Sequence, residues 1–596
     1  MFVDDCNRVL SKMTVNPFLC SLFQKMNSSL VFPQIIADDS FKVFQVGKGQ
    51  YNDFVHSRFV EGSADVISTT ISKNALKLPI HLKNVLQNVS PKIALSSILI
   101  TKLRDACCKR EEAAKQLFCS EFTNVPECLA TKDGKPYHST KSDLLQIIAP
   151  KTEENKAEYP GGPIDALVID FSVVIRSEAA VISKLQSFQE YTFSTFIEHL
   201  LRQIENQARK LHVRRMDIVL DTYQRCSVKG STREDRGNEA IFVFKEDDNL
   251  PKDFASEFLL NDQNKIKLNQ MVCECASNPL FWNWDGEIVI TRGTRVWSRS
   301  DGVNDLAEMK WDDGIHEEAD NRMVCHMKDI LYRGFTSIQL RTVDTDVVAI
   351  LLGFMPQFLE FNEDVVIIVD FGTGNNRRKI RINECYASLG EPICTGLMFF
   401  HAFTGCDSTC AFFHRTKTTW FQLWMNSPVW NELTTAFQQL SWLPTRSVID
   451  FNFGVIAEFV KSAYSNERGL TLNELRFMLF SSSPSGNLRE LPPSESALQQ
   501  HILRSTYQAG WVWGNTLSQR PLPPVTDCGW KMNSSNNKLV MKWTDTADQM
   551  STMMSLSNLL KTCKCAKSTT ECINCSCGRA GLKCLMFCNC KRRCIK

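Results

Sequence analysis

From Ile164 onward, short apolar runs of strand length alternate with segments of helical length. The runs are IDALVIDF, MDIVLD, EIVIT, SIQLRTVD and VVIIVDF, and helical stretches at Phe188–His212 and Glu317–Leu331 separate some of them. Strands that alternate with helices are typical of a parallel sheet with helical crossovers. The sequence therefore predicts an α/β domain over residues 164–445.

Three of these apolar runs end in aspartate. Asp170 ends ALVID, Asp221 follows MDIVL, and SIQLRTVD continues from Asp344 to Asp346. In an open parallel sheet the carboxyl ends of the strands share one edge, where ligands bind. Because side chains alternate along an extended segment, Asp344 and Asp346 are expected on the same side. Asp370 ends VVIIVD in the same way, but the sequence offers it no obvious partner.

Two further acidic elements fit the same edge. HEEADNR places Glu317, Glu318 and Asp320 at the start of a predicted helix, and FTGCDST places Asp407 at a glycine-containing turn. Helix geometry does not decide which of Glu317 and Glu318 points inward, because neighbours do not share a face. A single aspartate after a strand is more often a turn or helix cap than a ligand. The prediction of one common site therefore rests on the joint pattern.

Carboxylates that converge on one site need cations. Two like charges about 5 Å apart repel each other by roughly 3 kcal/mol at an effective dielectric constant of about 20. Oxygen-only ligands suit Mg²⁺ or Mn²⁺. Two such ions about 4 Å apart can hold the attacking water and the leaving oxygen of a phosphodiester. The acidic pattern is therefore compatible with hydrolysis assisted by two metal ions.

The order of these motifs resembles the flap endonuclease/XPG-type 5′-nucleases, over about residues 164–430. The resemblance implies a PIN-like, Rossmann-like parallel sheet with flanking helices. It also implies a structure-directed nuclease that cleaves DNA, with RNA as the second candidate, by means of two Mg²⁺ or Mn²⁺ ions. The catalytic residues that it implies are Asp170, Asp221, Glu318, Asp320, Asp344, Asp346 and Asp407.

The basic residues after Asp221 fit this family as well. If the segment is helical, Arg225, Lys229, Arg233 and Arg236 form one stripe, which the resemblance places in an arch that grips the nucleic acid. A solvated charged face is the alternative.

One segment departs from the family. Where the family has a glycine-containing phosphate-binding hairpin, this chain has AFFHRTKTTW. Arg415 and Lys417 remain candidates for phosphate contact there, and His401, just before it, is expected to be a packed histidine rather than a ligand.

The C-terminal tail concentrates cysteine. Nine of the 24 cysteines fall in the last 34 residues, namely Cys563, Cys565, Cys572, Cys575, Cys577, Cys584, Cys588, Cys590 and Cys594. Thiolates at such tight spacing bind Zn²⁺ tetrahedrally. Nine thiolates can serve three Zn²⁺ ions if three of them bridge. A tail this short has no room for a hydrophobic core of its own, so metal is expected to supply its folding energy.

The cysteine spacing around CSCGRAGLKC resembles the tesmin/TSO1-like CXC domain. That resemblance implies DNA binding, with phosphate contacts from Lys583, Lys591, Arg592 and Arg593. The tail carries eight basic residues against one acidic residue, although the whole chain has a net charge of only +2. A local anionic partner is therefore expected rather than general affinity for polyanions.

For the rest of the chain the sequence predicts only the type and approximate bounds of each region. We predict a mixed helical region over residues 1–130, a linker over 131–163, a helical region with Pro/Ser linkers over 446–560, and the CXC domain over 561–596. The sequence has neither the 18 or so consecutive apolar residues of a membrane helix nor a signal peptide, so a nuclear, non-secreted protein without a membrane partner is expected.

Two functional alternatives follow. HEEADNR, DTDV and HAFTGCD resemble transposon-associated invertebrate proteins of unassigned role. The chain is therefore expected to be either a nuclease tethered by its zinc-binding tail, or a non-catalytic DNA- or chromatin-binding protein that keeps the nuclease fold as a scaffold.

Overall fold

The structure is a computed structural model of the whole chain. It describes residues 101–149, 163–184, 191–221, 228, 241–292, 295–299, 319–483, 487–518, 520–533, 538–544, 559–564 and 575–590, together with the backbone at 23–24, 30–32, 97–100 and 306–309. The chain forms two compact units. Unit 1 comprises residues 1–92, 176–201 and 236–275, and unit 2 comprises 93–175, 202–235 and 276–596.

Unit 2 contains an eight-stranded sheet, which confirms the predicted α/β class. The strand order is β11 (Arg378–Arg381), β10 (Val366–Phe371), β9 (Ser337–Thr342), β3 (Ala166–Asp170), β4 (Arg215–Val219), β6 (Glu287–Arg292), β7 (Arg295–Arg299) and β8 (Leu306–Met309). The five strands from β10 to β6 pair in parallel, and β11, β7 and β8 add antiparallel edges. The five predicted apolar runs supply these five parallel strands.

The strand order reverses between β3 and β9. From β3 the chain continues on one side to β4 and β6, and it later returns to place β9 and β10 on the other side of β3. Ligand sites of open α/β sheets lie at such a reversal, at the carboxyl ends of the strands. Asp170 is the last residue of β3, and Asp344 lies two residues beyond the end of β9.

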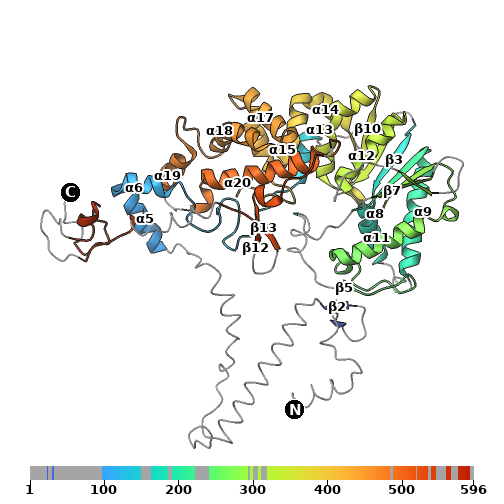
Figure 1. Cartoon of the computed structure of the whole chain (residues 1–596), viewed down its shortest axis with the longest axis horizontal. Coiled ribbons are helices and arrows are strands. Elements are labelled where there is room, and N and C mark those ends of the chain that lie inside the picture. The colour runs from blue at the N-terminus through green and yellow to red at the C-terminus, as the bar shows by residue number, and fades with distance from the viewer. Residues whose placement is uncertain are drawn as a thin grey trace, which may run out of the picture. The chain divides into compact units, whose positions relative to one another are not determined.

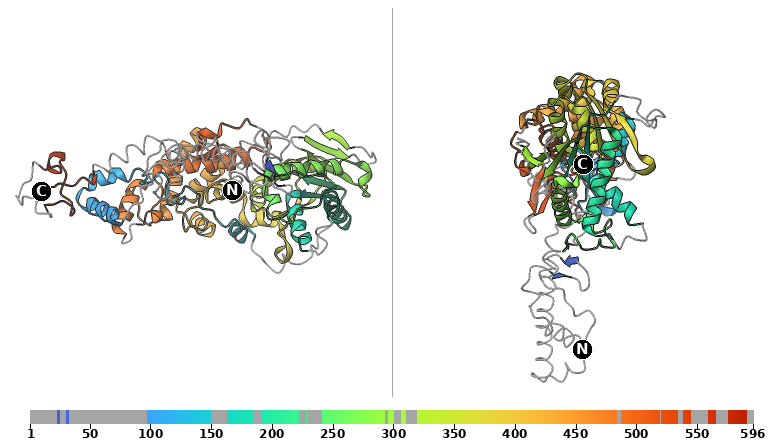
Figure 2. Two further views of the ribbon diagram at one scale, coloured as in Figure 1. Left: turned by 90° about the horizontal axis from the view of Figure 1, so that it is seen from below. Right: turned by 90° about the vertical axis from the view of Figure 1, so that its right-hand side faces the viewer.

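Helices cover one face of the sheet in layers (Figure 1). Next to the sheet lie α12 (Ala319–Tyr332) and α14 (Ile382–Leu389), and α13 (Thr345–Phe361) packs against both of these helices. Beyond lie α15 (Glu391–Phe403), α16 (Lys417–Met425), α17 (Trp430–Trp442), α18 (Arg446–Ser462) and α20 (Glu495–Thr506), which runs into a π-helix, η8 (Tyr507–Trp513). Figure 2 shows this yellow-to-orange helical layer in two further views.

The core of unit 2 extends further along the chain than the sequence predicts. Residues 131–163 are predicted to be a linker, but α7 (Ser142–Ile148) buries Leu144, Leu145 and Ile148 in the same core as the sheet. From the region predicted as a separate helical part, α18 and α20 contribute to this core as well. The spacing of the apolar residues in α7 gives it a buried face, and that face packs against α13 and α16.

A second, smaller core of unit 2 lies around two early helices. It joins α5 (Ser97–Lys109), α6 (Glu111–Leu117) and α19 (Leu472–Ser482) to the cysteine-rich residues 559–590. The sequence predicts helix over Ile93–Lys115, and the structure divides that range between α5 and α6. A two-stranded hairpin, β12 (Trp530–Asn533) and β13 (Lys538–Met541), completes the described strands of this unit.

Unit 1 has its own aromatic core. Its elements are β1 (Phe23–Gln24), β2 (Leu30–Phe32) and β5 (Ile241–Phe242), which form one small sheet, with parts of α8 (Phe171–Ile182), α9 (Phe193–Leu211) and α11 (Asp262–Ala276). Phe193, Phe244, Phe254 and Phe258 contact one another through their rings. None of the acidic residues singled out in the sequence belongs to this unit.

Candidate metal centres

An acidic centre lies at the predicted edge of the sheet. Asp320, Asp344 and Asp346 each offer a carboxylate oxygen, and these three oxygens lie within 4.8 Å of one another. Asp320 and Asp346 are buried, whereas the Asp344 side chain is 28% exposed. Three carboxylates so arranged can hold a divalent metal ion. Helix α12 supplies Asp320, and the start of α13 supplies the other two.

The Asp344–Asp346 segment has a different local geometry from the predicted extended strand. Asp344 is extended and caps α13, and its carboxylate accepts the backbone N–H of Asp346 at 3.0 Å. Asp346 lies in the first turn of the helix. The two carboxylates therefore meet because a helix begins between them.

Lys141, which the sequence analysis did not single out, lies among these carboxylates. Its Nζ is 3.2 Å from Asp344 Oδ1, 3.0 Å from Asp346 Oδ2 and 3.1 Å from Asp407 Oδ2. The ammonium group thus brings Asp407 to the same place as Asp344 and Asp346. Metal ions were expected to balance the converging negative charges, and Lys141 supplies a balancing cation from the protein itself.

Asp346 is held from its other side by His401. Its Oδ1 accepts a hydrogen bond from His401 Nε2 at 2.8 Å, while Nδ1 of the same ring has no hydrogen-bond partner among the described residues. Burial, together with the charge of the nearby Lys417, lowers the pKa of His401 to about 4. A neutral imidazole that donates from Nε2 fixes the carboxylate without adding charge. The predicted packed histidine is thus also a partner of the acidic centre.

Lys417 is enclosed rather than available to phosphate, contrary to the sequence-based expectation. Its Nζ donates to the His401 carbonyl at 2.9 Å and to Thr404 Oγ1 at 2.8 Å. The residue is fully buried, and burial lowers its pKa to about 7. Lys417 therefore fixes the end of α15 behind the acidic centre.

Two of the predicted acids lie at the border of the centre. Asp170 Oδ2 accepts a hydrogen bond from Thr342 Oγ1 at 3.1 Å, and the same hydroxyl accepts the Asp344 N–H. Thr342 thus links the end of β3 to the aspartates after β9. Asp221 accepts the backbone N–H of Ala319 at 3.0 Å, so it connects the end of β4 to the start of α12.

Asp370 has a structural role. Its carboxylate accepts two hydrogen bonds from the Arg377 guanidinium, at 2.8 and 2.5 Å, across the turn between β10 and β11. This pairing explains why an aspartate in the same local context stays outside the centre.

Several predicted residues lie outside the described part of the chain. They are Glu318, Arg225, Lys229, Arg233, Arg236, Lys591, Arg592, Arg593, Cys565, Cys572 and Cys594.

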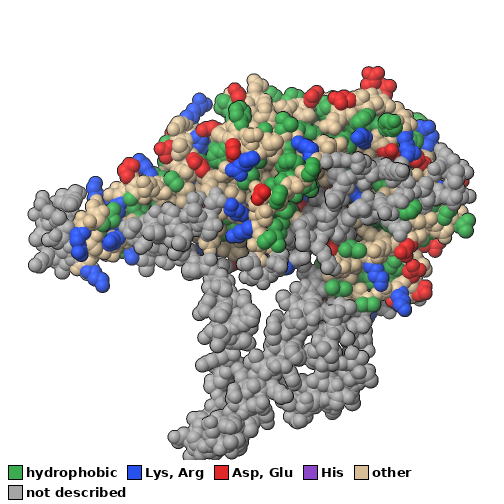
Figure 3. All heavy atoms as spheres, in the orientation of Figure 1, with side chains coloured by type: hydrophobic (Ala, Val, Ile, Leu, Met, Phe, Trp, Pro, Cys, Tyr) green, Lys and Arg blue, Asp and Glu red, His purple; other side chains and the backbone are tan. Residues whose placement is uncertain are grey.

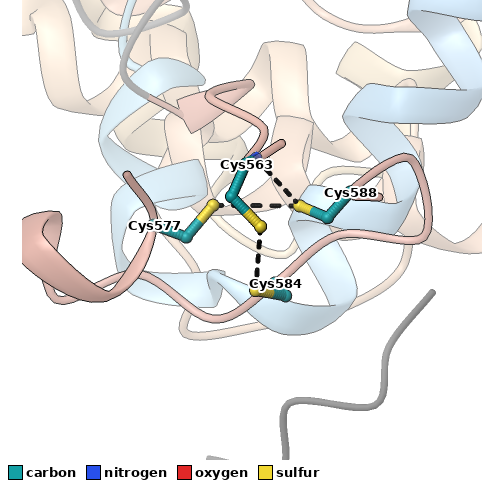
Figure 4. Close-up of side chains that lie close together, drawn as sticks. All are labelled: Cys563, Cys577, Cys584 and Cys588. Atoms are coloured by element: carbon teal, nitrogen blue, oxygen red, sulfur yellow. Dashed lines mark hydrogen bonds between the residues drawn. The ribbon is translucent and has the colours of Figure 1, made fainter. Parts of the chain in front are cut away.

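A thiol centre forms in the C-terminal segment. The sulfurs of Cys563, Cys577, Cys584 and Cys588 lie within 4.8 Å of one another and face a common point (Figure 4). Two of the sulfur pairs, Cys563–Cys584 and Cys577–Cys588, are 3.8 Å apart. Zn–S bonds of about 2.3 Å in a tetrahedron place sulfurs about 3.8 Å apart, so this group can hold zinc.

Further groups extend the thiol centre. Cys590 Sγ is 3.9 Å from Cys563 Sγ, and Cys575 Sγ accepts the N–H of Gly578 at 3.1 Å. Burial raises the pKa of Cys577, so this thiol stays protonated at neutral pH unless a cation displaces its proton. Figure 3 shows Lys and Arg side chains on this part of the surface, where Lys561, Lys564, Arg579 and Lys583 are exposed.

The comparisons with known proteins leave both centres unassigned. No protein-family model and no curated protein matches this chain. Within the described part of the chain, no helix combines the length and apolar character needed to cross a membrane.

Proposed function

We propose that the acidic centre is the active site of a metal-dependent nuclease with a PIN-like domain of the flap endonuclease type. The observation that carries the proposal is the Asp320, Asp344 and Asp346 triad at the β3/β9 reversal of a parallel sheet. An oxygen-only donor set favours Mg²⁺ or Mn²⁺ over Zn²⁺. The substrate class is DNA, with RNA as the second candidate.

The residues of the acidic centre would have different roles, namely metal binding, positioning and contact with substrate. The triad would hold the divalent cations, with Asp170, Asp221, Asp407 and Glu318 completing the set. His401 and Lys417 would keep Asp346 and the end of α15 in place. When bound, two such cations supply a water of lowered pKa and stabilise the leaving oxygen. When the carboxylates paired with Lys141 bind metal, the Lys141 ammonium would be displaced from them. It would then be available to contact a substrate phosphate.

The tail would hold the enzyme on its substrate. We assign the nine cysteines to a CXC-type cluster of three Zn²⁺ ions, whose exposed lysines and arginines would contact nucleic-acid phosphates. A nuclear location agrees with such a partner.

A cleavage assay tests the nuclease. Full-length protein is incubated with 5′-flap and single-stranded DNA, and with the matching RNAs, in Mg²⁺ or Mn²⁺. We expect metal-dependent cleavage that falls by roughly a hundredfold in Asp344→Asn and Asp346→Asn. Asp364→Asn is the matched control, because this exposed aspartate precedes β10 and lies at the opposite edge of the sheet. Equal cleavage by all four proteins rejects the assignment.

One observation favours the second candidate, a non-catalytic DNA- or chromatin-binding protein. Lys141 already contacts three of the carboxylates, as a fixed structural ion pair would. Titration with Mn²⁺ separates the two candidates. A nuclease binds the ion at the acidic centre, and the Asp346→Asn variant weakens that binding. A scaffold protein binds DNA but takes up no Mn²⁺ there.

A further inference from the structure

The thiol centre rests on helices that lie far away in the sequence. The small core of unit 2 packs Leu559, Leu585 and Cys563 of the tail against Leu103 of α5 and Phe118, just after α6. Three contacts made by side chains of α5 accompany this packing. Lys109 Nζ donates to the Cys584 carbonyl at 3.2 Å, the Met586 N–H donates to Asp105 Oδ2 at 2.5 Å, and Lys102 Nζ lies 5.3 Å from the centroid of the Phe587 ring.

Arg110, between α5 and α6, makes further and more extensive contacts with the tail. Its residue surface is only 5% exposed, and the hydrogen bonds of its guanidinium go to the tail. Nε donates to the Lys583 carbonyl at 2.8 Å, Nη1 to the Leu559 carbonyl, and Nη2 to the Lys561 carbonyl at 3.1 Å. One side chain thus holds together the two tail segments that carry the cysteines.

The fourth contact of Arg110 is to a cysteine of the centre. Nη2 lies 3.5 Å from Cys577 Sγ. Among the described residues, no carboxylate bonds to Arg110, so the sulfur is the one bonded group that can carry a negative charge. Burying an arginine without a counter-charge is costly. A neutral thiol provides no counter-charge for the Arg110 guanidinium, whereas four thiolates around one Zn²⁺ carry a net charge of about −2.

We propose that Arg110 is a positioning residue of the metal centre, which couples metal binding by the tail to the folding of α5 and α6. The inference rests on the zinc assignment made above. Metal-bound Cys577 would balance the guanidinium charge, and the guanidinium would in turn fix the backbone that carries the thiolates. Hydrogen-bonded partners of metal ligands typically change metal affinity by about 10–100-fold when they are removed. The tail is then a fixed part of unit 2 rather than a mobile tether.

Zinc release tests the role of the side chain. The full chain is loaded with Zn²⁺, its zinc content is measured, and release to a coloured chelator is followed for the parent, Arg110→Gln, Arg110→Lys and Arg579→Gln. We expect Arg110→Gln to release zinc at least about tenfold faster than the parent, with Arg110→Lys between them. Arg579→Gln removes an exposed charge from the same segment and should behave as the parent does. Equal release rates from Arg110→Gln and the parent overturn the inference.

Hydrogen exchange tests the coupling in the unaltered chain, so it does not depend on a variant that folds. Removing zinc from the parent should raise amide exchange across residues 97–117 and leave the strands β3 and β9 protected. Unchanged exchange in 97–117 overturns the inference. A parent that takes up no zinc overturns the zinc assignment and the inference with it. Zinc uptake with an indifferent Arg110→Gln leaves the assignment standing and rejects only the role of Arg110.

Discussion

Lys141 Nζ lies 3.0 Å from Asp346 Oδ2, and this ion pair joins α7 to α13 across 205 residues of sequence. The lysine side chain is 21% exposed, whereas the aspartate is 1% exposed. The Lys141 ammonium is therefore accessible enough to be displaced from the acidic centre. The Asp346 carboxylate is too deeply buried to rotate towards solvent. This arrangement lets the centre keep its shape without a metal ion.

Replacing Lys141 tests this competition. In Lys141→Met, removal of a positive charge a few ångströms from the metal position should tighten Mn²⁺ binding by at least about tenfold. Without metal, the unbalanced carboxylates should lower the melting temperature, and Mn²⁺ should restore it. Calorimetric titration and thermal unfolding measure the two effects, with Lys132→Met, a loop substitution, as the control. Unaltered Mn²⁺ affinity in Lys141→Met contradicts the competition.

His401 should act on the metal only through Asp346. His401→Leu removes the Nε2 hydrogen bond and leaves a buried carboxylate oxygen without that donor, so we expect Mn²⁺ affinity to fall by about tenfold or more. His401→Gln retains a side-chain donor and should lie closer to the parent. Electron paramagnetic resonance of bound Mn²⁺ measures both affinities, and circular dichroism checks the fold. A folded leucine variant with parental affinity refutes the positioning role.

Local sequence pattern was sufficient for five of the eight strands of the sheet and for part of the site. Short apolar runs of strand length, separated by helical stretches, identified the five parallel strands, whereas the antiparallel strands β7, β8 and β11 were not predicted. The rule that parallel strands expose their carboxyl ends at one edge predicts the position of Asp344 and Asp346 after β9, whereas Asp320 reaches this edge from helix α12. The exact geometry of Asp346 required knowing where α13 begins.

Residues that reach the two centres through long-range tertiary contacts could not be identified from local sequence patterns. Lys141 stands in the charge-rich stretch TKDGKPYHSTKS, which has the composition of a linker, and only the apolar spacing after it predicts α7. Arg110 meets the Lys583 carbonyl 473 residues away, and no local pattern encodes such a contact. The pairing of Asp370 with Arg377 was not predicted either, although the arginines of NNRRKI follow Asp370 at the length of a hairpin turn.

Asp370 should contribute to stability and not to metal binding. Its carboxylate is almost fully buried and paired with a half-exposed Arg377, so Asp370→Asn should cost about 1–3 kcal/mol of unfolding free energy. Mn²⁺ affinity should stay at the parental value. Urea unfolding and metal titration of Asp370→Asn, beside the exposed control Asp364→Asn, measure both quantities. Weakened Mn²⁺ binding in a folded Asp370→Asn would place this residue within the acidic centre after all.

His501 in α20 predicts a loss of stability in mild acid. Its Nε2 donates to the Phe403 carbonyl at 2.8 Å, and burial, aided by the charge of Arg504, lowers its pKa to about 3. A histidine in the unfolded chain has a pKa near 6.5. As the pH falls below 6.5, the unfolded chain therefore binds a proton at His501 that the folded chain does not bind. The free energy of unfolding consequently declines until the pH reaches about 3. His501→Gln keeps a donor but does not titrate. The stability advantage of the parent over this variant should therefore shrink by about 2 kcal/mol between pH 7 and pH 5, as measured by urea unfolding. An advantage independent of pH would show that the buried imidazole does not contribute to this acid sensitivity.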